Sequence, residues 1–213
     1  MIIMSALDSF LGVWGAQRLM DRTIEHLSMF AAAMVLATII GVAVGVAVHR
    51  HARVSQVLFN MLNVAETIPT IALLVLLLPV LGLGSRPTIV TSVIYSVLPI
   101  ARNTYAGLTS VSAEHLAVAE ALGLSRREVL VHVRFPLALP LVAGGIRIAL
   151  VFTMGVVTLG GLIAAGGLGA PLQTGIQLYD MDIIIVTGLW VGLLAVVFDA
   201  LAGYAEHRLG ERL

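Results

Sequence analysis

Long apolar runs alternate with short polar stretches along most of this chain. A helix that spans a membrane needs about 20 mostly apolar residues. Runs of sufficient length lie at approximately 27–48, 57–83, 88–108, 141–165 and 183–204. This pattern predicts an all-α integral membrane protein with about five transmembrane helices, which form a single domain over residues 27–204.

The second run and the two ends of the chain depart from this simple pattern. The second run contains Glu66, Pro69 and Pro79. Because it is longer than one straight crossing requires, we expect it to be tilted, kinked at Pro69 or partly interfacial. Residues 1–26 are too mixed in polarity to span and are predicted to form an interfacial lead-in. Residues 205–213 are predicted to form a cytoplasmic tail.

The composition supports lipid as the main solvent of the chain. Hydrophobic residues make up 59% and charged residues 11%, whereas a soluble domain has about 45–50% and about 25%. The net charge is zero, so no overall field favours a nucleic-acid partner. The chain has no cysteine and no recognisable metal motif or Ser-His-acid cluster, so we predict no metal, no cofactor and no catalytic residues.

The arginines are distributed unequally between the two sides of the predicted bundle. The side with more arginine in its loops is normally cytoplasmic. One side receives nine of them, namely Arg50, Arg53, Arg102, Arg126, Arg127, Arg134, Arg147, Arg208 and Arg212. The other side receives Arg18, Arg22 and Arg86. This asymmetry predicts an external N-terminus, a cytoplasmic C-terminus and a cytoplasmic position for residues 109–140, here called the charged segment.

The charged segment carries start and stop signals for two short helices. Ser112 is a plausible N-cap for a run of good helix formers, and Gly123 ends that run. Ser125 and Glu128 have the spacing of a capping box, and Pro136 is expected to stop the second helix. A solvated loop needs no such signals, although a loop with some helix remains the alternative. Two capped helices joined at an angle favour a rigid element that docks to a partner.

The same segment resembles a loop shared by the permeases of ABC transporters. That loop has a Glu-Ala-Ala start, a glycine, and an apolar-x-apolar-Pro ending. Here Gly123 is followed by nine residues and then by Val133-Arg-Phe-Pro136. The chain departs from the pattern at one place: Ala117 stands where the loop's glutamate belongs, and Glu120 follows one helical turn later.

Other segments resemble the permease subunits of osmoprotectant importers, which take up glycine betaine, choline, carnitine and related compounds. These segments are 66–84, 95–108, 136–149 and 163–176. The resemblance implies a subunit of a type I importer with five or six helices in the bacterial cytoplasmic (inner) membrane. It also implies a second permease, identical or paralogous, two cytoplasmic ATPase subunits and an extracytoplasmic substrate-binding protein.

The resemblance assigns ATP hydrolysis to a partner, and the chain itself has no GxxxxGK[ST] phosphate loop. We therefore expect no enzyme activity from the chain alone. Docking to the ATPase is assigned to the charged segment. The candidate coupling residues are Ala117, Glu120, Gly123, Ser125, Arg126, Arg127, Glu128 and Pro136.

Residues that interrupt the apolar runs are candidates for the translocation path or its gate. An acid within a span is costly and proline frees a backbone carbonyl, so both can mark a pathway, although simple helix curvature is the alternative for the prolines. The candidates are Glu66, Thr67, Pro69, Pro99 and Asn103.

Two other functions remain open from the sequence. A freestanding secondary transporter or channel usually needs ionisable residues deep in its spans, and only Glu66, Arg147 and Asp199 are candidates. An ABC permease for an amino acid such as methionine is the other alternative.

Overall fold

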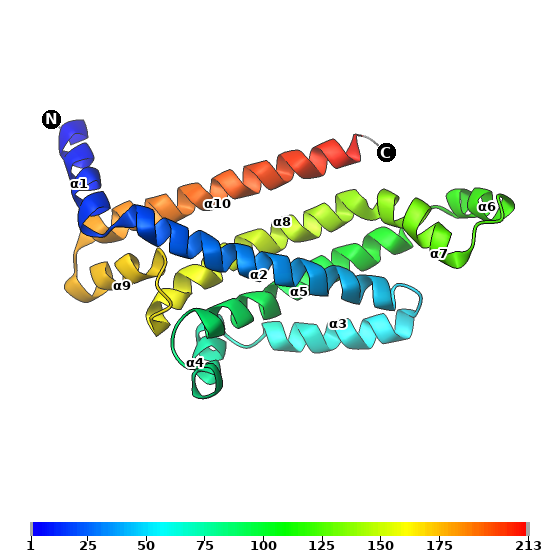
Figure 1. Cartoon of the computed structure of the whole chain (residues 1–213), viewed down its shortest axis with the longest axis horizontal. Coiled ribbons are helices and arrows are strands. Elements are labelled where there is room, and N and C mark those ends of the chain that lie inside the picture. Colours follow the sequence, from blue (N-terminus) through cyan, green and yellow to red (C-terminus); the bar gives the residue numbers. More distant parts are fainter. Residues whose placement is uncertain (1, 212–213) are drawn as a thin grey trace. The chain divides into compact units, whose positions relative to one another are not determined.

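The computed structural model describes residues 2–211, and every regular element in that range is helical (Figure 1). Met1 of the predicted lead-in and residues 212–213 of the predicted tail, Arg212 among them, lie outside this range. The elements are α1 (Ile2–Ala16), α2 (Leu19–Val48), α3 (Ala52–Glu66), α4 (Thr70–Leu81), α5 (Ser85–Thr109), α6 (Ala113–Ala121), α7 (Arg126–Val129), the π-helix η1 (Leu130–Arg134), α8 (Phe135–Leu159), the 3₁₀-helix η2 (Gly160–Ile163), α9 (Gly169–Leu178) and α10 (Met181–Gly210). The predicted all-α class is confirmed.

Three helices of the described range are long and apolar enough to cross a membrane. They are α2, the continuous helix Arg126–Ile163 and α10. A fourth span results if α3 and α4 are counted together as one broken span. These helices cover four of the five predicted runs.

The remaining run corresponds to α5, which is 25 residues long but more polar than the other long helices. Five of its hydroxyl side chains are buried, namely Thr88, Thr91, Ser92, Ser96 and Thr104. Several of their hydroxyls donate to a carbonyl one turn earlier, as Ser92 does to Thr88 at 2.9 Å and Thr104 to Ile100 at 2.8 Å. Such local hydrogen bonds allow hydroxyl side chains inside a protein core.

The break in the second run lies at Pro69, which confirms the predicted kink. Helix α3 ends at Glu66, and Pro69 precedes α4 with extended backbone angles of −56° and 133°. Proline disfavours helical geometry in the preceding residue and has no N–H to donate, so the first helix stops before it.

The first membrane helix begins earlier than the apolar pattern indicates. Helix α2 starts at Leu19, where the sequence predicted a start near residue 27. Its first turns are polar, but Arg22 pairs with Glu25 along the helix, and Arg18, which precedes the helix, pairs with Asp21. Pairs at this spacing stabilise helical structure, so polarity there does not end the helix.

The chain divides into two compact units, each built from three separate segments. The first contains the described part of residues 1–35 with 68–93 and 151–198. Its core joins α1, α2, the residue before α9 and α10 through Val13, Leu19, Leu168, Ile183 and Val186. The Trp14 and Trp190 rings meet edge to face at 4.9 Å, and the Trp190 indole donates to the Thr23 hydroxyl at 2.9 Å.

The second unit contains residues 36–67, 94–150 and the described part of 199–213. Its helices approach closely at small residues. A Cβ at Gly45 of α2 would lie 2.6 Å from Thr104 Cβ of α5, and one at Gly107 of α5 would lie 2.8 Å from Ala138 Cβ of α8. Small residues at helix contacts are typical of membrane proteins, because they let the backbones pack closely.

Candidate functional site

The charged segment begins with a helix that is capped at both ends. The Ser112 hydroxyl accepts a hydrogen bond from the His115 amide at 3.4 Å. At the other end, Gly123 adopts a left-handed φ of +74°. The Gly123 amide donates to Glu120 at 2.9 Å and the Leu124 amide to Ala119 at 3.1 Å. This pair of bonds is the Schellman motif. The Ser112 cap confirms the predicted start of α6, and the Schellman motif confirms its predicted end.

The second helix of the segment starts with the predicted capping box. The Ser125 hydroxyl accepts from the Glu128 amide at 3.4 Å, and the Glu128 carboxylate accepts from the Ser125 amide at 2.7 Å. The two reciprocal bonds satisfy amides that lack partners at a helix start. The direction of the chain after Gly123 is therefore fixed by local hydrogen bonds.

The prediction that Pro136 stops the second helix is wrong. Helix α7 continues through the π-turn η1 into α8, and Pro136 is the second residue of α8. In the π-turn the Phe135 amide donates to Leu130, five residues back. This shift in the bonding pattern accommodates a proline, which has no amide to donate, and is a known use of π-turns. The charged segment therefore contains one short helix and the start of a 38-residue helix, Arg126–Ile163.

Two arginines attach the charged segment to the rest of the second unit. The Arg50 guanidinium donates to the Arg126 carbonyl at 3.1 Å, and Arg134 donates to the carbonyl of Leu108 near the end of α5. They help to line a groove of about 540 Å³. The groove is lined by His49, Arg50, Thr109, Leu116, Glu120, Leu124, Arg126, Val129 and Arg134. Glu120 is the acidic side chain in this basic groove.

Most of the predicted coupling residues lie on the surface. Ala117, Glu120, Gly123, Ser125, Arg126, Arg127 and Glu128 are exposed, whereas Pro136 is half-buried. Apolar side chains of α6 are exposed among them, with Val118 at 57% and Leu122 at 73%. A second groove of about 390 Å³ runs beside these two residues. A surface that combines charge with exposed apolar side chains is suited to a protein partner.

The predicted pathway residues of the second unit make mainly local contacts. The Thr67 hydroxyl donates to Val64 of its own helix at 2.7 Å, and the Asn103 amide donates to Pro99 at 2.9 Å. Half-buried Glu66 interacts electrostatically with Arg102 of α5. The Asn103 bond lies within α5, so these residues do not form one polar cluster among the described contacts.

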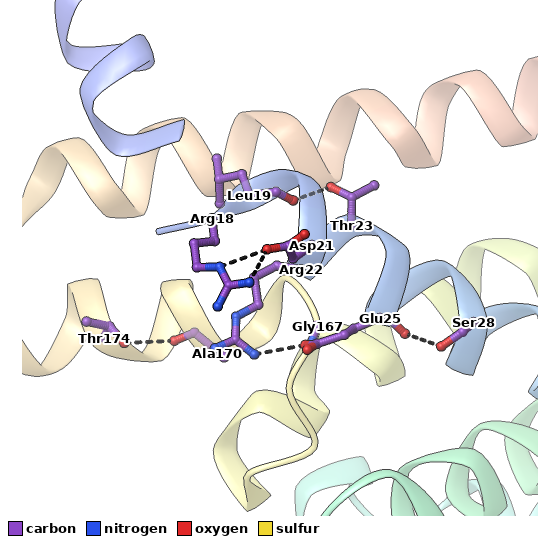
Figure 2. Close-up of polar contacts among 10 residues, drawn as sticks. All are labelled: Arg18, Leu19, Asp21, Arg22, Thr23, Glu25, Ser28, Gly167, Ala170 and Thr174. Atoms are coloured by element: carbon purple, nitrogen blue, oxygen red, sulfur yellow. Dashed lines mark hydrogen bonds and ion pairs between the residues drawn. The ribbon is translucent and has the colours of Figure 1, made fainter. Parts of the chain in front are cut away.

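Two ionic clusters were not foreseen from the sequence. In the second unit, Arg147 pairs with Asp199 and Glu206 of α10. In the first unit, the Glu25 carboxylate accepts from Arg22 at 2.8 Å and from the Gly167 amide at 2.9 Å (Figure 2). The opposite charges of Arg147 and Asp199 within apolar runs were a usable signal, because intramembrane charges usually pair.

The helical fold and its apolar spans define a helical membrane protein. Residues 33–211 match the family model described as the inner membrane component of binding-protein-dependent transport systems. The chain belongs to this family. It is therefore a multi-pass inner-membrane protein of a transport system that also uses a binding protein, and not an enzyme in its own right.

Three relatives that are similar in sequence over most of the chain are permease proteins. The choline transport system permease protein OpuBB of Bacillus subtilis is 35% identical over 191 residues, which cover 90% of this chain and 88% of the relative. The glycine betaine/carnitine/choline transport system permease protein OpuCB of the same species is 34% identical, covering 97% and 94%. The osmoprotectant import permease protein OsmW of Salmonella typhimurium is 38% identical, covering 88% and 87%.

Solved structures support the same fold. A chain from the inward-facing MetNI methionine ABC transporter matches with a TM-score of 0.79 and 23% identity, covering 90% of this chain and 96% of that one. A chain from an amino acid ABC transporter with histidines matches with a TM-score of 0.76 and 16% identity, covering 93% and 98%. At these identities the likeness concerns the fold alone.

Proposed function

We propose that this chain forms the translocation path of an ABC importer for an osmoprotectant or a related quaternary amine. The observation that carries the proposal is the 34–38% identity, over most of the chain, to permeases named for choline, glycine betaine, carnitine or osmoprotectants. The working importer contains this chain, a second permease that is identical or paralogous, two cytoplasmic ATPase subunits and an extracytoplasmic binding protein.

Uptake by a strain that lacks this gene and its paralogues tests the cargo. We expect loss of binding-protein-dependent uptake of radiolabelled glycine betaine, choline or carnitine, and restoration by the gene on a plasmid. Methionine uptake serves as the matched control, because the structural neighbour named for methionine shares only the fold. Loss of methionine uptake with normal uptake of all three amines would contradict the proposal.

The charged segment is the docking element for the ATPase in this proposal. Its support is the exposed position of Glu120, Arg126 and Arg127 and the exposed apolar face of Val118 and Leu122. The half-buried Pro136 contributes to the path of the helix behind this surface. Glu120 replaces, one turn later, the acid that the family loop carries at the position of Ala117.

Co-purification of the ATPase tests this role. Removal of a solvated surface charge changes a binding free energy by about 0–1 kcal/mol. We expect Glu120→Ala to weaken the binding of the ATPase by more than this. Asp21→Asn is the matched control, since Asp21 is exposed and its ion pair among the described residues is with Arg18, three positions away. If both variants retain the ATPase and transport like the parent, Glu120 is not part of the docking surface.

A further proposal is that the N-terminus is external, and that the C-terminus and the charged segment are cytoplasmic. The chain has no cysteine, so single cysteines give clean labelling. Both Ser125 and Gln177 are exposed. An impermeant thiol reagent added to intact cells should label Gln177→Cys, and Ser125→Cys only after the cells are opened. The reverse labelling pattern would show that the proposed topology is inverted.

The same importer requires a path through the spans, for which Glu66, Thr67, Pro69, Pro99 and Asn103 remain our candidates. The break at Pro69 and the half-buried position of Glu66 beside Arg102 support this assignment. Glu66→Gln should lower the maximal uptake rate in the same assay while the amount of assembled complex stays at the parent level. Unchanged uptake would remove Glu66 from the path.

A further inference from the structure

An ion pair joins α8 to the C-terminal part of α10 within the second unit. Arg147 donates from Nε and Nη2 to the two carboxylate oxygens of Asp199, at 2.7 and 2.9 Å. Its Nη1 donates to Glu206 at 3.4 Å. Both helices belong to candidate membrane spans, where charges are costly unless they are paired. Because the guanidinium fork matches a carboxylate at two points, it fixes the spacing and the rotation of the two helices together.

Two glycines make room for this ion pair, one on each helix. A Cβ at Gly203 of α10 would lie 2.9 Å from Arg147 Nη1, and a Cβ at Gly144 of α8 would lie 2.9 Å from Glu206 Oε1. In each helix the glycine precedes the charged residue by three positions, which places the two on one helical face. Each helix thus offers a charge to the glycine of the other, so the contact depends on both backbones.

The ion pair lies on the same continuous helix as part of the charged segment. Helical structure runs without interruption from Arg126 through Arg147 to Ile163. A rigid helix transmits a displacement at one end along its length, and a fixed contact passes it to the neighbouring helix. The contact with Asp199 and Glu206 therefore connects movement of the charged segment with movement of the C-terminal part of α10.

Glu206 gives Arg147 a second acidic partner on α10. Asp199 and Glu206 are seven positions apart and lie on one face of α10. Arg147 binds Asp199 at two points and Glu206 at one longer distance. A small sliding of α8 along α10 would lengthen the contact with one acid while shortening the contact with the other. All three side chains are partly exposed, at 34–40%, and a cavity of about 530 Å³ adjoins Arg147 and Glu206, so there is space for this exchange.

We propose that Arg147 is a positioning residue of the transport cycle, which keeps the C-terminal part of α10 in register with the helix that carries the charged segment. The inference rests on the proposed function as an ATPase-driven importer. Without Arg147 the helices remain inserted but lose their register, so ATP hydrolysis is no longer matched by uptake.

The test uses the complete complex, reconstituted in liposomes with its binding protein and glycine betaine as the probe. Arg147→Gln should keep the assembled amount and the basal ATPase rate within about twofold of the parent, and should lower uptake per ATP at least tenfold. The exchange Arg147→Asp with Asp199→Arg should restore a large part of the coupling, which a merely structural loss would not predict. The matched control is Arg86→Gln, since Arg86 is exposed and forms no ion pair among the described residues.

The proposal is overturned if Arg147→Gln couples ATP to uptake like the parent, or if the exchanged pair is no better than Arg147→Gln. If Arg147→Gln fails to assemble, Gly203→Ala decides, because the methyl group displaces the guanidinium without removing its charge. We expect this variant to assemble and to lose uptake per ATP severalfold; parental coupling would overturn the proposal.

The parent complex shows separately whether the proposed function is wrong. In that case it hydrolyses ATP but does not take up glycine betaine. Stimulation of ATP hydrolysis by the binding protein then replaces uptake as the readout, since it requires no knowledge of the cargo. Loss of this stimulation in Arg147→Gln, with a normal basal rate, supports the positioning role, and full stimulation refutes it.

Discussion

Two glycine-containing turns of this chain are held in opposite ways. In the first unit, the turn at 160–169 is closed by direct backbone contact: a Cβ at Gly161 would lie 2.2 Å from the carbonyl carbon of Gly169. A Cβ at Gly169 would lie 2.0 Å from Thr158 O. In the second unit, Gly123 has a left-handed φ of +74° and no atom within 4 Å of an added Cβ. Positions 161 and 169 need glycine for space, whereas position 123 needs it for its backbone angle.

The difference gives the two turns different roles: the turn at 160–169 contributes to stability, and the turn at Gly123 contributes to partner binding. The turn at 160–169 is also held from outside by the Glu25 carboxylate, which accepts from the Gly167 amide (Figure 2). The turn at Gly123 is held mainly by its own caps, with one distant bond from Arg50 to the Arg126 carbonyl, and its surface stays exposed. A substitution in the first turn should therefore impair folding, whereas one in the second should re-aim a surface that remains folded.

The largest expected effect is that of Gly161→Ala. Its methyl group overlaps backbone atoms that cannot rotate away, so the free energy of unfolding should fall by about 3 kcal/mol or more. Thermal unfolding in detergent and the yield of inserted protein measure this. Gly155→Ala is the control, because nothing lies within 4 Å of a Cβ there. Parental unfolding of Gly161→Ala would mean that the turn is not closed by contact.

Gly123→Val should come next. A β-branched residue at this φ costs roughly 1–3 kcal/mol of local strain, which the segment relieves by changing the direction of the chain after α6. The protein should insert normally but retain less ATPase on co-purification and show reduced uptake. Gly123→Asn is the control, since asparagine tolerates the left-handed region. Equal behaviour of the two variants would show that the backbone angle is unimportant.

Ser125→Ala removes one half of the capping box. Loss of an N-cap costs about 1 kcal/mol, so amides 126–129 should exchange with solvent about fivefold faster in a hydrogen-exchange experiment. Ser28→Ala serves as the control, because the Ser28 hydroxyl donates to the Glu25 carbonyl within its own helix. Unchanged exchange would indicate that contacts beyond the caps hold the segment.

Glu25→Gln should have the smallest effect. The amide oxygen still accepts from Gly167 but lacks the charge, and the Glu25 side chain is 48% exposed. We therefore expect a loss of only about 0.5 kcal/mol of unfolding free energy, measured by thermal unfolding beside Asp21→Asn. A loss as large as that of Gly161→Ala would make the carboxylate, rather than the backbone contact, the main support of the turn.

The features that the sequence determined by itself are local ones. The caps at Ser112, Gly123 and Ser125 involve residues at most five positions apart, so their hydrogen bonds depend on the chain alone. The break at Pro69 follows from the missing amide of one residue. The apolar runs identified a helical membrane protein because lipid requires every spanning backbone to satisfy its own hydrogen bonds.

Only the tertiary structure decided the features that depend on distant neighbours. Pro136 was expected to end a helix, but a π-turn absorbs its missing amide and the helix continues. The pairing of Arg147 with Asp199 joins residues 52 positions apart. A charged residue within an apolar run does not by itself identify the residue with which it pairs. Gly161 and Gly169 are eight positions apart, yet their backbones touch. Short-range hydrogen bonds are fixed by sequence spacing, whereas close packing and ion pairs between helices depend on which faces meet, and the order of residues along one chain does not specify that.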